Sequence, residues 1–162
     1  MPQPIEIEVN SPTRIIVGVT GASGVVYAKR CLEALRDAGV QSHLVVSKAA
    51  EMTLSYELGI KAGDLEPLAA KRYAASDIGA PISSGSFMTA GMIIAPCSVK
   101  TMSEIATGVT SNLISRAADV TLKERRRLVL MVRETPFHLG HLRTMTALAE
   151  MGAIIAPPLP SF

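Results

Sequence analysis

The chain has 162 residues, of which 48% are hydrophobic, 19% charged and 4% aromatic, and its formal net charge is +2. The apolar fraction supports a full core and excludes a disordered chain, and the near-neutral charge argues against a nucleic-acid-binding surface. No apolar run approaches the roughly 18 residues of a transmembrane helix, so we expect no membrane span.

The length fits one domain, which we place at residues 14–162 behind an N-terminal arm of residues 1–13. The arm contains no Lys or Arg, so we expect neither a signal peptide nor a transit peptide. Cys31 and Cys97 lie far apart without metal-site spacing, which is typical of a reduced, cytoplasmic protein. The mean hydropathy of +0.32 predicts apolar surface buried between subunits, and hence an oligomer.

Buried strands and helices alternate along the chain. In order, the pattern predicts a strand at 14–20, helix 25–38, strand 42–47, helix 48–58, a weaker helix 63–73, loop 76–89, strand 91–95, helices 101–107 and 112–124, strand 128–132, a helix from Pro136 to about Met151 and strand 153–156. Apolar strands separated by helices form a parallel sheet covered on both faces. Ligands of such sheets bind beyond the carboxyl ends of the strands, so candidate binding residues are expected there.

The first two strands end in small and hydroxylated residues. Residues 20–24 read TGASG, whose small side chains let helix-start N–H groups approach a phosphate or a flat ring. Glycines at 18, 21 and 24 do not match the G-x-G-x-x-G dinucleotide pattern, and a tight turn alone is the other interpretation. Ser47 stands where a dinucleotide enzyme would place Asp or Glu, which fits a mononucleotide phosphate or simply a helix N-cap.

The third and fourth strands end in groups suited to an anion. Ser98, Lys100 and Thr101 place two hydroxyls and a cation at a helix start. Arg133 and Glu134 leave a buried strand as adjacent opposite charges, which is costly unless they have partners or face a ligand. These residues therefore predict a binding site at the carboxyl ends of the strands.

Other charged and nucleophilic residues leave alternatives open. Arg116, Asp119 and Lys123 share one helix face, as a ladder of ion pairs or as a cationic wall for an anionic substrate. Residues 123–127 are expected to form a solvated turn. Cys97 has no nearby His to activate it and is expected to pack in the core.

A metal site is not expected in this chain. His138 and His141 follow Glu134, but Pro136 keeps that glutamate off the helix face that would carry the histidines. The sequence also lacks an Asp-rich cluster that would hold Mg²⁺ on a diphosphate, so any phosphate chemistry depends on Lys, Arg and backbone dipoles.

Taken together and in order, these segments resemble the UbiX-type flavin prenyltransferases, formerly described as aromatic acid decarboxylases. The resemblance covers residues 14–162 and rests on TGASG (20–24), SKAA (47–50), ISSGSF (82–87), PCSVKT (96–101), RAADV (116–120), LKERR (122–126), RETP (133–136) and the ending GAIIAPPLPSF (152–162).

The resemblance implies a Rossmann-like, three-layer α/β fold of the homo-oligomeric FMN-containing decarboxylase superfamily. Its members form homo-oligomers, often dodecamers, and bind FMN at subunit interfaces. They transfer a dimethylallyl group from dimethylallyl phosphate to reduced FMN without a metal. The prenylated flavin then serves a UbiD-type decarboxylase of aromatic acids, for example in ubiquinone synthesis.

Site roles carried over from the family fall on residues of the matching motifs. The resemblance implies FMN contacts from Gly21, Ala22, Ser23, Ser47, Ser98, Val99, Lys100, Thr101 and Arg133. It places the prenyl phosphate against Arg116, Lys123 and Glu134, and it assigns proton handling to Ser23 and Glu57. A protonated Glu134 is expected to donate to the leaving phosphate, which gives the catalytic set Ser23, Glu57, Lys123 and Glu134.

In the family the chain continues past the position of Phe162 with a Tyr and later an Arg that face the prenyl phosphate. We therefore expect a C-terminal tail to be missing and that phosphate site to be incomplete, with FMN binding retained. Two other functions are considered. One is an FMN-dependent oxidative decarboxylase of cysteine-derived carboxylates, although its Pro-x-Met-Asn type segment is absent, and the other is a flavin-binding module without chemistry.

Overall fold

A computed structural model describes residues 11–160, and its centre is a six-stranded parallel sheet in the order β3-β2-β1-β4-β5-β6. The strands are β1 (Arg14–Val19), β2 (Gln41–Val46), β3 (Lys71–Ala74), β4 (Gly91–Cys97), β5 (Arg127–Val132) and β6 (Ile154–Ile155). The helices are α1 (Val26–Asp37), α2 (Lys48–Leu58), α3 (Val99–Thr107), α4 (Leu113–Lys123) and α5 (Leu139–Glu150), with 3₁₀ segments η1 (Ala62–Leu68) and η2 (Pro81–Ser83). The expected α/β fold is confirmed.

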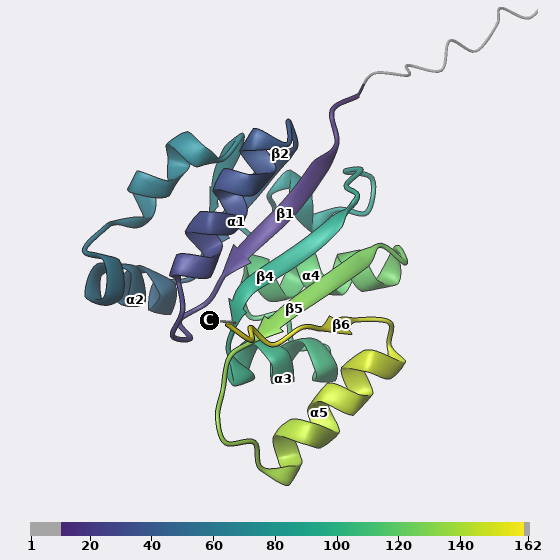
Figure 1. Cartoon of the computed structure of the whole chain (residues 1–162). Coiled ribbons are helices and arrows are strands. Elements are labelled where there is room, and N and C mark those ends of the chain that lie inside the picture. The colour runs from purple at the N-terminus through teal and green to yellow at the C-terminus, as the bar shows by residue number, and fades with distance from the viewer. Residues whose placement is uncertain (1–10, 161–162) are drawn as a thin grey trace, which may run out of the picture.

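Two apolar clusters, one on each face, hold helices against the sheet. Alternate residues of the inner strands, such as Val17 and Leu44, pack under α1, α2 and η1. Their neighbours Ile16 and Val45 pack with α3, α4 and α5 on the opposite face. On the same face α1 also packs against Ile93 of β4, whereas within the described residues no helix covers β5 and β6 there (Figure 1).

The strand order creates a crevice between β1 and β4. The chain crosses from β1 to β2 through α1 on one face, whereas α3 follows β4 on the other face. The helices therefore diverge where the carboxyl ends of β1 and β4 meet, and this is the point at which ligands of open α/β sheets bind.

Two predicted helices are wrong in part. The stretch 63–73 contains η1 with Pro67 inside it, and then the edge strand β3. An edge strand exposes polar side chains to water, so Lys71 and Arg72 interrupt the apolar pattern that would predict a strand here. The last helix begins at Leu139, not at Pro136, because His138 and His141 cap each other's backbone N–H through their Nδ1 atoms at 3.2 and 3.3 Å.

The remaining elements agree with the predicted ones within about two residues, and β4 runs on through Pro96 to Cys97. Most of the expected N-terminal arm, residues 1–10, lies outside the described residues, as do residues 161–162. No helix in the described chain has the length and hydropathy to cross a bilayer.

Candidate active site

A cavity of about 370 Å³ lies beyond the carboxyl ends of β1, β4 and β5. Its lining residues are Gly21, Ala22, Ser23, Ala49, Ser98, Val99, Lys100, Arg133 and Glu134. The volume falls within the range of about 300–1,000 Å³ that is usual for small-molecule sites. The structure thus brings together strand-end residues that the sequence predicts as a site, and adds only Ala49.

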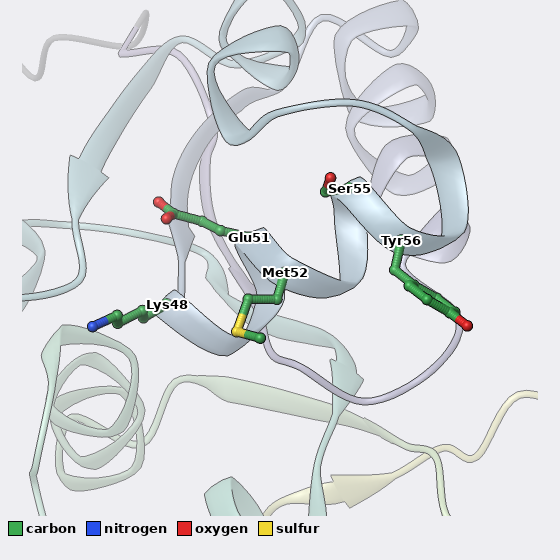
Figure 2. A pocket seen from close by; sticks show the side chains of 5 residues that line it. All are labelled: Lys48, Glu51, Met52, Ser55 and Tyr56. Carbon is green, nitrogen blue, oxygen red and sulfur yellow. The ribbon is translucent and has the colours of Figure 1, made fainter.

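A wider hollow of about 680 Å³ lies over the outer surface of α2, between Lys48 and Tyr56. All of its lining side chains come from that one helix, and Figure 2 shows that they spread apart without converging. Tyr56 is 94% exposed there. A single helix cannot enclose a ligand, so the strand-end cavity is the candidate site.

The first wall of the cavity is a turn pressed closely against α2. A Cβ on Gly21 would lie 2.6 Å from the Cβ of Ala49, which is closer than real side-chain atoms approach. Thr53 of α2 donates a hydrogen bond from Oγ1 to the carbonyl of Gly21 at 2.9 Å. Ala49 carries no reactive group, so only its contact with Gly21 reveals its role in shaping the cavity.

Glu57 of α2 occupies the N-terminus of α1. Its carboxylate accepts hydrogen bonds from the hydroxyl of Ser23 at 2.6 Å and from the N–H groups of Gly24 and Val25 at 3.1 and 3.2 Å. Burial raises the pKa of Glu57, but these hydrogen bonds and the charge of Arg133 lower the pKa by more, so the net shift is downward. The carboxylate is therefore held ionised beside Ser23.

The second wall is the N-terminus of α3. Ser98 is its N-cap, and its Oγ accepts the N–H of Thr101 at 3.2 Å. Val99 and Lys100 follow in the first turn, where backbone N–H groups have no acceptor within the helix. Both residues line the cavity, so this helix end presents donors and a positive dipole to a ligand.

The third wall comes from the end of β5. The N–H of Arg133 donates to the carbonyl of Cys97 at 3.1 Å, which joins the ends of β5 and β4. Arg133 and Glu134 line the cavity and add a second cation, beside Lys100, and a carboxylate. The three walls together fit FMN, with the tight Gly21 turn suited to a flat ring and the start of α3 to a phosphate.

Five predicted site residues, Lys123 among them, do not line this cavity. Ser47 caps α2 by accepting the N–H of Ala50 at 3.0 Å, two residues before Ala49. Thr101 lies behind Ser98 in the first turn of α3. Glu57 reaches the site only through Ser23, and Arg116 pairs with Asp119 at 3.0 Å.

Lys123 lies near the amino end of β5, whereas the cavity lies beyond the carboxyl ends of the strands. It ends α4 just before β5 begins at Arg127, whereas Glu134 lies two residues beyond Val132, the last residue of β5. Six strand residues, or about 20 Å, therefore separate the two positions. Lys123 pairs with Glu124 there, close to Gly85, and one protomer does not bring it beside Glu134.

Cys97, His138 and His141 have structural roles. Cys97 is fully buried, and burial raises the pKa of its thiol to about 12, which confirms a packing role. His138 and His141 stack at 3.5 Å and cap α5. Among residues 11–160, no three His, Cys, Asp or Glu side chains gather as a metal site.

Comparison with known proteins identifies the relatives of this chain. The Flavoprotein family model matches residues 6–160. The flavin prenyltransferase UbiX of Thauera aromatica is 56% identical over 149 residues, which cover 92% of this chain and 77% of that protein.

Solved structures show the same relationship. A UbiX structure in complex with FMN and dimethylallyl pyrophosphate matches with a TM-score of 0.92 and 48% identity, covering 94% of this chain and 81% of that one. A dodecameric FMN-dependent UbiX-like decarboxylase from Escherichia coli O157:H7 matches with a TM-score of 0.90 and 46% identity, covering 93% and 82%. An FMN-dependent cysteine decarboxylase, TvaF, is only 16% identical at a TM-score of 0.75 and shares the fold alone.

Gly21→Ala is expected to weaken FMN binding by about tenfold or more, because the added methyl group must push the turn away from Ala49. Quenching of FMN fluorescence measures the dissociation constant. Gly63→Ala is the matched control, since nothing lies within 4 Å of its Cβ position. Equal FMN affinities in both variants and the wild type would contradict the role given to this close contact.

Glu57→Gln is expected to unfold more easily than the wild type at neutral pH, and the difference should shrink in acid. A carboxyl group whose folded-state pKa is lowered stabilises the fold above its unfolded-state pKa, and this contribution is lost as the pH falls through the folded-state pKa. Urea unfolding of both proteins between neutral pH and the glutamate range measures the difference. A difference that stays constant with pH would show that the ionised carboxylate is not the stabilising group.

Proposed function

The chain belongs to the flavoprotein family and, within it, to the UbiX-type flavin prenyltransferases, and on that basis we propose that it transfers a dimethylallyl group to reduced FMN. One observation carries the proposal for this chain: the cavity at the β1–β4 crevice is lined almost entirely by the residues expected to hold FMN. Its two cations, Lys100 and Arg133, the N-terminus of α3 and the tight Gly21 turn suit a phosphate joined to a flat ring.

We propose dimethylallyl phosphate as the prenyl donor, and the related structure shows that a UbiX protein holds the pyrophosphate ester together with FMN. Reduced FMN supplies the electron-rich ring that accepts the dimethylallyl group as the carbon–oxygen bond to phosphate breaks. Glu134, at the cavity wall, protonates the leaving phosphate, and Arg133 and Lys100 provide positive charge nearby. No step in this scheme requires a metal.

Ser23 and Glu57 move the proton on the flavin side of the cavity. Ser23 lines the cavity, and its hydroxyl already donates to the ionised carboxylate of Glu57 at 2.6 Å. A proton lost toward Glu57 lets Ser23 accept one from a ligand in turn, so the pair is a two-residue relay. Glu57 itself faces α1 and acts on the ligand through Ser23.

We further propose that active sites lie between subunits of a homo-oligomer, as the dodecameric relative suggests. Lys123 belongs to the set of residues expected at the prenyl phosphate, yet it lies across the sheet from Glu134 of the same protomer. A neighbouring copy would supply Lys123, and Arg116 from the same helix, to the cavity. This arrangement gives Lys123 its expected role without moving α4.

The prenylated flavin would serve a UbiD-type decarboxylase. We propose a cytoplasmic location, which the two free cysteines support because reduced thiols persist there. FMN contacts are proposed from Ser47 through the start of α2, which it caps, and from Thr101 through the first turn of α3, in which it lies. The 14–162 unit is proposed as one FMN-binding domain.

Incubation of the protein with reduced FMN and dimethylallyl phosphate, without oxygen and with EDTA, is expected to raise the flavin mass by one isoprene unit. The pyrophosphate ester is tested in parallel, and mass spectrometry of the released flavin gives the result. Glu134→Gln should lower the single-turnover rate by about 100-fold with FMN affinity unchanged. An unchanged flavin mass would favour a binding module, and loss of CO₂ from a peptidyl cysteine would favour the decarboxylase.

Lys123→Ala and Arg133→Ala are each expected to be nearly inactive alone, yet to recover activity in mixed oligomers. If each site takes Lys123 and Arg133 from different copies, random mixing restores roughly a quarter of the sites. Co-expression with two different tags and tandem purification gives the mixed oligomer, and the prenylation assay measures it. No recovery in mixed oligomers would place both residues in the same subunit's site.

A further inference from the structure

Thr20 occupies the point where β1 and β4 separate. The regular pairing of these strands ends at Gly18 and Ile94, short of the cavity. Beyond that point the Thr20 hydroxyl donates to the carbonyl of Pro96 at 2.6 Å and accepts the N–H of Ser98 at 2.9 Å. Its backbone N–H also donates to Pro96 at 3.3 Å. The side chain and the backbone N–H of this one residue therefore replace the missing strand pairing at the mouth of the crevice.

The residues on either side of this link are cavity walls. Gly21 follows Thr20 directly and begins the turn that suits the flat ring. Ser98 is the N-cap of α3, so its backbone position sets where the first-turn N–H groups of Val99 and Lys100 point. Thr20 itself is 2% exposed and does not line the cavity, so any effect on a ligand acts through these neighbours.

We propose that Thr20 is a positioning residue for FMN, one that fixes the separation between the Gly21 turn and the N-terminus of α3. The inference rests on the proposed function, because FMN is the ligand that spans both walls. A hydroxyl suits the position since it donates and accepts at once. Valine has the same shape but neither capacity, and it would leave the Ser98 N–H and the Pro96 carbonyl without this partner.

Another buried threonine provides a matched control. Thr121 of α4 is 1% exposed, and its hydroxyl donates to the carbonyl of Ala117 at 2.7 Å. That bond lies within one helix and joins no part of the cavity. Thr→Val at either position removes a buried hydroxyl and its hydrogen bond, but only the change at Thr20 releases the cavity walls.

The test compares the FMN dissociation constants of Thr20→Val, Thr20→Ser and Thr121→Val, with thermal unfolding of each protein in the absence of FMN. Thr20→Val is expected to bind FMN about tenfold more weakly, Thr20→Ser within about twofold of the wild type, and Thr121→Val like the wild type. Lower thermal stability is expected in both valine variants. Wild-type affinity in Thr20→Val, or equal weakening in Thr121→Val, would overturn the proposal.

Hydrogen exchange of the wild-type protein tests the same link without a substitution, and it decides the matter if Thr20→Val does not fold. The amide of Ser98 is expected to exchange at least about 100-fold more slowly than an exposed amide before FMN is added. Exchange at the exposed rate would show that the wall is not fixed in advance. Failure of the wild type to bind FMN would count against the proposed function, whereas the exchange of Ser98 still reports on Thr20.

Discussion

The divergence of the chain at the β1–β4 junction is the constraint on which the site depends. A parallel sheet needs helical crossovers, and the crossovers from these two strands leave on opposite faces. The helices that follow the two strands therefore leave the carboxyl end of the junction open, and the backbone groups that emerge there must find other partners. Thr20 satisfies those nearest the sheet, and the rest, at the start of α3, face the cavity.

Three of the helices that begin at this edge border the cavity, and a carboxylate occupies the N-terminus of one of them, α1. The first N–H groups after the β1 turn bind the carboxylate of Glu57, and the hydroxyl of Ser47 takes up an N–H at the start of α2. At the start of α3, Val99 and Lys100 line the cavity, and Arg133 lies on the neighbouring wall. Electrostatics would thus orient the proposed FMN, since the Glu57 carboxylate repels a phosphate and the N-terminus of α3 attracts one.

Sequence reasoning succeeds where a signal is local and fails where tertiary contacts decide. Each strand end carries distinctive residues, so convergence of the end of β1 with those of β4 and β5 follows from the parallel topology alone. The sequence does not reveal Ala49 as a cavity residue, because its contribution is the small size of its side chain opposite Gly21. The edge strand β3 is not predicted because Lys71 and Arg72 give it a polar pattern. Lys123 matches a family motif, but the motif does not indicate at which end of the strands the residue lies.

The proposed role of Lys123 at the prenyl phosphate would connect oligomerisation to catalysis, because Lys123 lies away from the cavity of its own protomer. A lone protomer would carry the flavin pocket at one edge of its sheet and Lys123 near the other, so it would have two half-sites and no complete one. In a closed symmetric assembly every copy has the same neighbours, so one contact that joins the two edges completes every site at once. The apolar excess of the sequence is consistent with such contacts, because surface that would be costly in a monomer is buried between copies. On this arrangement, dissociation of the oligomer removes the cation from the prenyl phosphate while the flavin pocket stays intact, so binding and transfer are separable properties of the same chain.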